Sequence, residues 1–337
     1  GTAGWTKEDA SVLVYDRYDI WQLQPENKTT AVNLTNGRAL ATSYRYIKTD
    51  PDALDIDPRE MLLLKMVEDK SCRQGFANLV LSQPAKQRTL ILSDHEYSGL
   101  LKAKKADRYL WQRSSYTECP ELYAGTSDFT ITKKLSVSNP QQSQYLWGTV
   151  EHVYWKSFDG GDMRGLLYKP ENFDPSKKYP MIVYFYEKYS NQIHSHYIPS
   201  PSRSIVNFTY CNNGYIVFVP DITYRTGEPG RSAYDDIISG TMAMTKLPYI
   251  DSDRMGIQGQ SWGGYQVAYL VTQTRMFKAA MAGAPVSNMT SAYGGIRWES
   301  GVVRQFQYEH GQSRIGANLW ENRDLYIENS PVFYANR

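Results

Sequence analysis

The residues most suggestive of chemistry lie at 259–264, where the sequence reads Gly-Gln-Ser-Trp-Gly-Gly. This Gly-x-Ser-x-Gly spacing stands between a run typical of a buried strand and a run typical of a helix. In so sharp a turn, side chains two residues before and after the serine would clash, so glycine is needed at Gly259 and Gly263. The turn exposes the Ser261 hydroxyl, and the backbone N–H of Trp262 at the helix start can donate to a developing oxyanion. The pattern predicts a serine nucleophile at Ser261.

Two other interpretations of this turn are a phosphate-binding loop and a serine in an ordinary tight turn. A phosphate loop requires Gly-Lys-Ser or Gly-Lys-Thr, with the lysine at the start of the helix. No lysine stands at that position, because Trp262 and Gly263 follow the serine directly. The phosphate loop is therefore excluded, and the ordinary turn is the remaining alternative.

The wider sequence resembles the prolyl oligopeptidase family of serine peptidases, especially its dipeptidyl-peptidase and acylaminoacyl-peptidase branches. The resemblance implies a β-propeller joined to a C-terminal α/β-hydrolase domain. It covers most of residues 150–337 and, more loosely, the part before them. The segments that carry it are Gly259–Tyr265 (GQSWGGY), Phe277–Ala280 (FKAA), Ala284–Ser287 (APVS), Phe158–Gly161 (FDGG) and Gly165–Pro170 (GLLYKP).

The resemblance also implies a second oxyanion donor, a tyrosine hydroxyl at the end of the strand that follows Lys-Tyr-Pro. Counted from Pro180, this place falls on Tyr186. The family usually continues with Gly-Gly-Pro or Ala-Gly-Pro, whereas this chain continues Glu-Lys-Tyr. We therefore expect the backbone to turn differently after Tyr186, with Tyr184 and Tyr189 as alternative donors and ordinary strand packing as the alternative for all three.

The family's pocket for the residue before the scissile bond is lined by the region after the nucleophile helix. That region carries Val286, Met289 and Tyr293 here, and Trp262 is expected to add a wall. Core packing is an equally good interpretation of these apolar side chains. Endopeptidase, dipeptidyl-peptidase and acylaminoacyl-peptidase specificity all stay open.

The other members of a catalytic triad are not found. In an α/β-hydrolase the order is serine, then Asp or Glu, then histidine. His310 is the one histidine after Ser261, and it precedes Asp324 in a polar stretch, so we expect a solvated surface residue. His194 and His196 form His-x-His without a suitable third ligand nearby, so we expect no metal, and no cofactor.

Residues 151–337 alternate apolar runs with helical patterns, which predicts a parallel sheet with its site at the carboxyl ends of the strands. We expect helices at Tyr234–Lys246 and Gly264–Gln273, where the apolar spacing is helical. The expected strands are Met181–Tyr186, Gly214–Pro220, Met255–Gly259 and Ala279–Ala284.

Residues 1–150 read as short strands and turns, and a group of three strands recurs about every 45 to 55 residues, near the length of a propeller blade. The groups are Ser11–Asp16, Asp19–Gln24 and Ala31–Thr35; Met61–Val67, Phe76–Gln83 and Arg88–Ser93; and Arg108–Ser114, Glu121–Gly125 and Thr130–Ser136. We predict a partial β-propeller followed by an α/β-hydrolase domain, with a β-sandwich as the alternative for the first part. Three blades do not close a ring, so we expect an open arc or a fragment.

The end of the sequence, Ser330–Arg337, resembles the family segment that immediately precedes the strand bearing the catalytic aspartate. We therefore expect the C-terminal part of the hydrolase, with the Asp and His of the triad, to be missing from this chain, which alone would be nearly inactive. The predicted function is a serine peptidase that hydrolyses short peptides through an acyl-enzyme at Ser261. The alternatives are a non-catalytic peptide- or protein-binding module and a carboxylesterase.

Composition excludes several other classes. The 37 Lys and Arg residues nearly balance the 35 Asp and Glu residues, which argues against a nucleic-acid partner, and no apolar run is long enough to span a bilayer. The expected partner is a peptide substrate, with homo-oligomerisation left open. Cys72, Cys119 and Cys211 match no metal or redox spacing, so we expect buried thiols, with a Cys72–Cys119 bridge as the alternative. We expect a periplasmic or secreted location, with the cytoplasm as the alternative.

Overall fold

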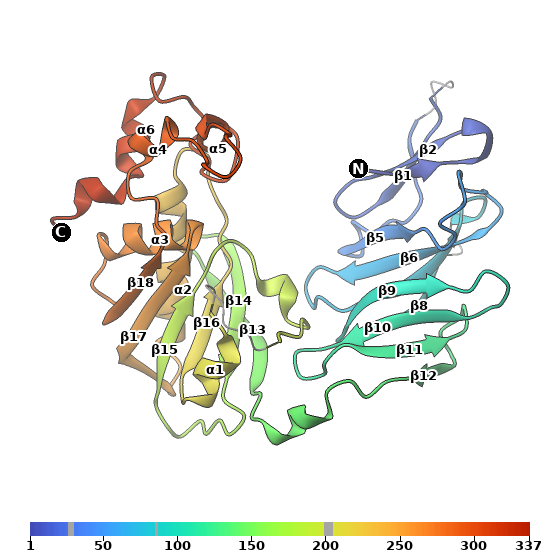
Figure 1. Cartoon of the computed structure of the whole chain (residues 1–337), viewed down its shortest axis with the longest axis horizontal. Coiled ribbons are helices and arrows are strands. Elements are labelled where there is room, and N and C mark those ends of the chain that lie inside the picture. The colour runs from blue at the N-terminus through green and yellow to red at the C-terminus, as the bar shows by residue number, and fades with distance from the viewer. Residues whose placement is uncertain (26–29, 85–86, 199–204) are drawn as a thin grey trace. The chain divides into compact units, whose positions relative to one another are not determined.

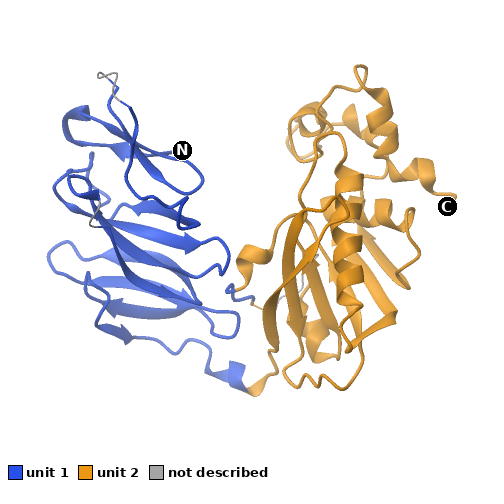
Figure 2. Cartoon of the chain, turned by 180° about the vertical axis from the view of Figure 1, so that it is seen from behind, with its two compact units in different colours: residues 1–143, 194–197 blue, residues 144–193, 198–337 orange. Residues whose placement is uncertain are grey.

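The computed structural model describes residues 1–25, 30–84, 87–198 and 205–337. The chain divides into two compact units, which we call unit 1 (Gly1–Ser143 with His194–Tyr197) and unit 2 (Gln144–Ile193 with Ile198–Arg337) (Figure 2). The boundary expected near residue 150 falls inside the first strand of unit 2, β13 (Thr149–Lys156). Each unit is described by itself below.

The described part of unit 1 forms four-stranded antiparallel sheets, each built from strands that are consecutive in the sequence (Figure 1). The first sheet holds β1 (Thr2–Trp5), β2 (Val12–Tyr15), β3 (Ile20–Leu23) and β4 (Val32–Asn33). The second holds β5 (Thr42–Ile47), β6 (Met61–Glu68), β7 (Gln74–Val80) and β8 (Arg88–Ser93). The third holds β9 (Glu96–Lys102), β10 (Tyr109–Ser114), β11 (Glu121–Gly125) and β12 (Thr132–Lys134). These sheets have the blade-like arrangement that the sequence predicts.

The sequence pattern found three strands of each sheet and missed the first. The missed strands β1, β5 and β9 all lie at a sheet edge. Edge position alone does not explain why they were missed, because β4, β8 and β12, which the pattern found, are edge strands as well. In β9, Gly99 adopts φ +60° and interrupts the alternation.

The middle sheet of unit 1 is covered on both faces, which explains the apolar run at 61–67 that only Lys65 interrupts. Leu62 and Leu64 of β6 pack into one core with Leu13 and Ile20 of the first sheet. Leu63 faces the other way, into a core that includes Trp111 of the third sheet. Because successive side chains of a strand point to opposite faces, a strand enclosed on both sides loses its alternation. The stacking of consecutive sheets thus follows from the sequence.

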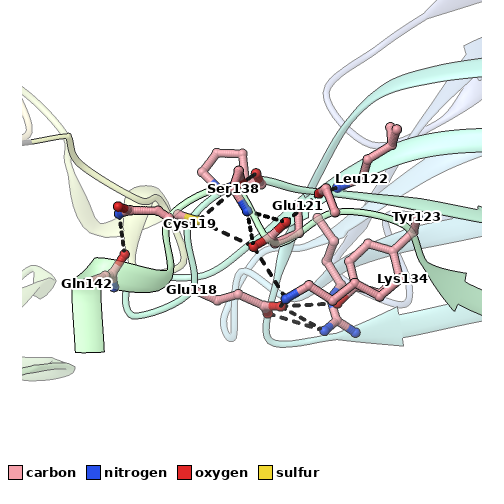
Figure 3. Close-up of polar contacts among 12 residues, drawn as sticks. Glu118, Cys119, Glu121, Leu122, Tyr123, Lys134, Ser138 and Gln142 are labelled. Carbon is pink, nitrogen blue, oxygen red and sulfur yellow. Dashed lines mark hydrogen bonds and ion pairs between the residues drawn. The ribbon is translucent and has the colours of Figure 1, made fainter. Parts of the chain in front are cut away.

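A buried carboxylate closes the third sheet (Figure 3). Glu121, at the start of β11, is only 3% exposed. It accepts hydrogen bonds from the Ser136 hydroxyl and from the Ser138 backbone N–H, the latter at 3.1 Å, and Lys134 Nζ lies 3.4 Å from it. Burial alone would raise the pKa of Glu121, but these hydrogen bonds and the lysine outweigh it and lower that pKa below its ordinary value.

A second carboxylate, Glu118, lies beside it and is similarly occupied (Figure 3). Arg113 donates to it at 3.2 Å and the Tyr123 hydroxyl at 3.1 Å. His95 Nε2 lies 3.3 Å and Lys134 Nζ 3.8 Å from its oxygens. We refer to Glu118, Glu121 and these partners as the carboxylate network.

Unit 2 is built on a six-stranded sheet with the order β13-β14-β16-β15-β17-β18. After β13 its strands are β14 (Asp162–Lys169), β15 (Tyr179–Tyr184), β16 (Ile216–Pro220), β17 (Ile250–Gln260) and β18 (Ala279–Gly283). The last four run parallel, as predicted, whereas β13 and β14 form an antiparallel hairpin and β14 pairs antiparallel with β16. The parallel arrangement predicted for the strands at 181–186, 214–220, 255–259 and 279–284 is therefore confirmed, whereas β13 and β14 were not predicted. A tight turn at Asp159–Gly161 joins them, and no crossover helix intervenes.

Helices cover both faces of this sheet. On one face, α2 (Pro229–Met244) and α3 (Trp262–Val271) enclose the main core, which includes Met181, Val183 and Ile257. On the other face lies α1 (Asn207–Asn212), whose Tyr210 hydroxyl donates to Gln258 at 3.2 Å (Figure 1). Helix α2 begins earlier than the sequence predicts because Pro229 starts it.

Short helices gather beyond the carboxyl ends of the parallel strands (Figure 1). They are α4 (Met289–Tyr293), α5 (Gln305–Glu309) and α6 (Arg323–Glu328). Their Met289, Tyr308 and Tyr326 form a core with Trp262 and Tyr265 of α3. We call these helices and their connecting loops the C-terminal helical cluster.

Two expectations from composition can be compared with the structure. Among the described residues, no helix is long and apolar enough to cross a membrane. The three cysteines are free thiols; Cys72 and Cys211 are buried and Cys119 is half-buried, so the alternative of a Cys72–Cys119 bridge was wrong for this structure.

Candidate active site

Ser261 stands alone between β17 and α3, at a sharp turn from strand to helix. Its backbone adopts φ 59° and ψ −113°, a conformation that L-residues rarely take. A Cβ on Gly259 would overlap the Gly263 carbonyl, and one on Gly263 would come within 2.6 Å of the Phe185 oxygen. Both flanking glycines are therefore required sterically, as the spacing predicts.

The neighbouring strand fixes this turn from the other side. The Ser261 N–H donates to the Gly283 carbonyl at the end of β18, at 2.7 Å. A Cβ on Gly264 would overlap that same carbonyl, so α3 approaches β18 as closely as glycine allows. The small residues of β18 and the double glycine of the turn thus work together to hold Ser261.

The Ser261 hydroxyl is exposed and, within the described part of the chain, its oxygen forms no hydrogen bond. The adjacent Trp262 N–H opens α3, where no preceding turn supplies an acceptor, and it too has no partner among the described residues. A nucleophile and an N–H donor therefore lie side by side at a helix N-terminus, where partial positive charge favours an anion.

The Trp262 side chain is buried in the core that α3 forms with the C-terminal helical cluster. Its indole is 2% exposed, stacks on Tyr265 at a centroid distance of 4.4 Å, and donates through Nε1 to the Tyr224 hydroxyl at 3.1 Å. Burial raises the pKa values of Tyr224 and Tyr265, so both phenols stay protonated at neutral pH. The contribution of Trp262 here is its backbone N–H, and its predicted role as a pocket wall stays a prediction.

Tyr186 follows β15, which ends at Tyr184, and β15 pairs in parallel with the nucleophile strand β17. The Tyr186 ring lies against the first turn of α3, 3.7 Å from where a Gly263 Cβ would stand. Gln266 of α3 donates to the Tyr186 carbonyl at 3.1 Å, and the Tyr224 hydroxyl does so at 3.3 Å. These bonds tie the strand end that carries Tyr186 to the helix that begins after Ser261.

The backbone after Tyr186 turns without the family's glycines, by means of a buried carboxylate. Asp221, at the end of β16, accepts from the N–H groups of Tyr189 and Ser190 at 2.7 and 2.9 Å. The Glu187 carbonyl accepts from the Ile222 N–H at 2.9 Å. Tyr184, the first alternative donor, is buried with its ring 5.9 Å from that of Tyr189, whereas Tyr186 is only half-buried.

The predicted pocket residues belong to the C-terminal helical cluster. Met289 is fully buried, Tyr293 is 3% exposed, and Val286 is half-buried beside them. Asn288 caps α4 by accepting from the N–H of Thr290 at 3.0 Å. Val286 presents the most accessible surface of the three, and their role in binding substrate stays a prediction.

No histidine partner for Ser261 is found. All five histidines lie in the described residues, and none is hydrogen-bonded to Ser261. His310 is 82% exposed, as expected for a solvated residue, and its nearest carboxylate is Glu309 at 3.8 Å. His152 in unit 2 contacts the Ser190 carbonyl at 2.8 Å. In unit 1, His194 and His196 contact the carbonyls of Ser71 and Tyr116, respectively.

Sequence reasoning missed the polar residues that support this site. Tyr224 and Gln266 hydrogen-bond each other and converge on the Tyr186 carbonyl, while Gln312 and Arg314 approach Tyr186 and Glu187. Gln266 stands one helical turn after Trp262, and both side chains donate to the Tyr224 hydroxyl. That the two side chains share a face of α3 could have been inferred from this spacing. Nothing local in the sequence connects Gln312 to Tyr186.

Comparison with solved structures shows the fold. Porphyromonas gingivalis dipeptidyl peptidase 4 superposes with a TM-score of 0.70 at 18% identity, covering 98% of this chain and 45% of that one. The prediction of blade-like sheets followed by an α/β unit is confirmed at this level.

Sequence comparison finds similarity to one family. The model of the prolyl oligopeptidase family matches residues 202–337. Dipeptidyl-peptidase 5 of Porphyromonas gingivalis is 26% identical over 289 residues, which are 76% of this chain and 41% of that protein. Human dipeptidyl peptidase 8 is 30% identical over 181 residues, 49% of this chain and 19% of that protein. The chain thus spans less than half the length of these relatives. The resemblance to the prolyl oligopeptidase family is confirmed.

Proposed function

We propose that the protein is a serine peptidase that cleaves short peptides, with Ser261 as its nucleophile. The observation that carries the proposal is an exposed serine hydroxyl without a hydrogen-bond partner, held in a strained turn beside the free N–H of Trp262. Strain of this kind persists where the surrounding structure enforces it, and it is concentrated at functional sites. The names of the relatives, dipeptidyl peptidases, support peptides as the substrate class.

In the proposed mechanism, Ser261 Oγ attacks the peptide carbonyl carbon and gives its proton to a histidine base. The carbonyl oxygen gains negative charge, which the Trp262 N–H and the Tyr186 hydroxyl stabilise by hydrogen bonds. The C–N bond then breaks, the departing amine takes the proton from the histidine, and an acyl-enzyme remains. Water, activated by the same histidine, releases the acid and regenerates the serine.

We propose that this histidine and its carboxylate partner come from residues outside the present sequence. Strand β18 supports this, because Ala279–Ala282 are exposed although they form an apolar strand beside the nucleophile strand. An apolar parallel strand is normally covered on both faces and flanked by neighbours. The present chain alone is accordingly expected to be nearly inactive.

A fluorophosphonate probe tests the proposal, because it labels only an activated serine. The full-length protein should be labelled, the Ser261→Ala variant should not, and Ser287→Ala, which removes another exposed serine of unit 2, should label normally. No labelling of the wild type would favour the binding module. Labelling combined with cleavage of p-nitrophenyl esters, but not of dipeptidyl anilides, would favour the carboxylesterase.

A further inference from the structure

The Tyr186 hydroxyl receives a hydrogen bond from a distant residue. Gln312, in the loop between α5 and α6, donates through Nε2 to the Tyr186 hydroxyl oxygen at 2.9 Å. A phenol has a single proton to donate, and its oxygen can also accept. With the amide as donor, the oxygen acts as the acceptor in this contact, and the hydroxyl proton stays available for another partner.

The Gln312 main chain is itself held in place by Arg314. Arg314 Nη1 donates to the Gln312 carbonyl at 2.6 Å, and Nη2 pairs with Glu187, the residue after Tyr186, at 3.0 Å. The guanidinium also lies over the Tyr224 ring, 4.1 Å from its centroid. Planar guanidinium groups suit such simultaneous pairing and stacking.

The backbone at Arg314 is constrained as well. Arg314 adopts φ +53°, an unusual value for a residue with a side chain, and its carbonyl accepts from the Gly227 N–H at 2.8 Å. A strained residue persists where its surroundings enforce it. The loop therefore delivers the Gln312 amide to one place, beside the Tyr186 hydroxyl.

We propose that Gln312 is a positioning residue that orients the Tyr186 hydroxyl as an oxyanion donor. Its amide occupies the acceptor side of the phenol oxygen, which directs the phenol's one proton towards the substrate oxygen. The proposal rests on the proposed function, because it gives Gln312 a role only if Ser261 generates an oxyanion. It assigns to the C-terminal helical cluster a part in catalysis beyond packing.

The direction of the hydrogen bond supplies the test. Gln312→Glu keeps size and shape but offers a carboxylate, which only accepts and would capture the Tyr186 proton. Its turnover should fall about 10²-fold, close to the loss of an oxyanion donor. Gln312→Ala removes the contact without capturing the proton and should lose only about three- to tenfold. The Michaelis constant of both variants should stay nearly unchanged.

The measurement is kcat and KM of the full-length protein with a dipeptidyl anilide, repeated in a Tyr186→Phe background. There the Gln312 substitutions should change kcat less than twofold, because the hydroxyl they act on is gone. A role in folding alone would persist in that background. If Gln312→Glu fails to fold, Gln312→Met, equal in length and without a donor, takes its place and should match Gln312→Ala.

The failures of the two proposals are distinguishable. Wild-type protein without Ser261-dependent fluorophosphonate labelling would overturn the proposed function, and the role of Gln312 with it. Labelled wild type whose Gln312 variants keep full turnover, or lose it equally in the Tyr186→Phe background, would overturn the positioning role alone.

Discussion

The carboxylate network of unit 1 and the serine turn of unit 2 treat polar groups in opposite ways. Glu121 is buried and accepts from Ser136 and Ser138, with Lys134 beside it. At the serine turn, the Ser261 hydroxyl and the Trp262 N–H have no partner among the described residues. The first region contains more charge, and the second contains more unused hydrogen-bonding capacity.

This difference separates structural from functional polar groups better than charge or burial does. Buried polar groups in folded proteins are nearly always paired, as Glu121 is, whereas the exposed Ser261 hydroxyl can exchange water for a substrate. The carboxylate network joins β11 to the segment after β12. This structural role is sufficient to explain its hydrogen bonds. At the serine turn, neighbouring carbonyls and amides hold the backbone while leaving the reactive groups free, as a site prepared for an incoming substrate requires.

The largest expected effect comes from replacing by alanine either the serine of the turn, Ser261, or the serine that donates to Glu121, Ser136. Ser261→Ala should lower turnover of the full-length protein by about 10⁴- to 10⁶-fold, as removal of a triad nucleophile does. Its melting temperature should not fall, because the lost hydroxyl has no partner. Ser136→Ala should do the reverse: it should destabilise the fold by about 1 kcal/mol and leave turnover unchanged. Equal effects of both variants on turnover would remove the contrast.

The next effect compares two tyrosine hydroxyls. Tyr186→Phe should lower kcat by about 10²- to 10³-fold with KM nearly unchanged, because the hydroxyl acts on charge that appears in the transition state. Tyr123→Phe, which removes the donor to Glu118 in unit 1, serves as the matched control and should keep full kcat. Steady-state kinetics with a dipeptidyl anilide decide. A loss of less than threefold for Tyr186→Phe would move the role to Tyr184 or Tyr189.

The sequence predicted what depends on local pattern. The Gly-x-Ser-x-Gly spacing identified the turn because the clash between Gly259 and Gly263 involves residues four apart. The pattern of apolar residues located most strands to within two or three residues, and it missed β1, β5 and β9, the first strand of each sheet in unit 1. The sequence did not reveal that β13 and β14 form an antiparallel hairpin beside the parallel strands. The direction of a strand is set by the connection that precedes it and not by the strand's own composition.

The supporting residues of the site could not be predicted, because their contacts join distant parts of the chain. The pair Gln312–Tyr186 depends on a loop that Arg314 and Gly227 hold at a strained angle. Likewise, the turn after Tyr186 is made by Asp221 from another strand in place of the expected glycines. The residue type alone does not identify Gln312 or Asp221 as supporting residues of the site, because glutamine and aspartate are common on any protein surface.

The smallest effect concerns acid and tests whether the carboxylate network is purely structural. The hydrogen bonds that lower the pKa of Glu121 in the folded protein are absent in the unfolded chain, where its pKa is about 4.3. A carboxylate with a lowered folded pKa stabilises the fold above its unfolded pKa, and that stabilisation is lost as pH falls through the folded value. Glu121→Gln should therefore cost about 1 to 3 kcal/mol at pH 7.

The difference in unfolding free energy between wild type and Glu121→Gln should narrow below about pH 4.3. There the carboxylate of the unfolded wild-type chain binds a proton, while the folded carboxylate, with its lowered pKa, binds one only at lower pH. Urea unfolding of the full-length proteins at pH 7, 5, 4 and 3 measures this gap. Turnover at pH 7, measured at urea concentrations below those that unfold the protein, should be the same for wild type and Glu121→Gln. A gap that stays constant or widens on acidification would show that the charge of Glu121 contributes nothing to stability, and a changed turnover would show that the network is more than a structural closure of the third sheet.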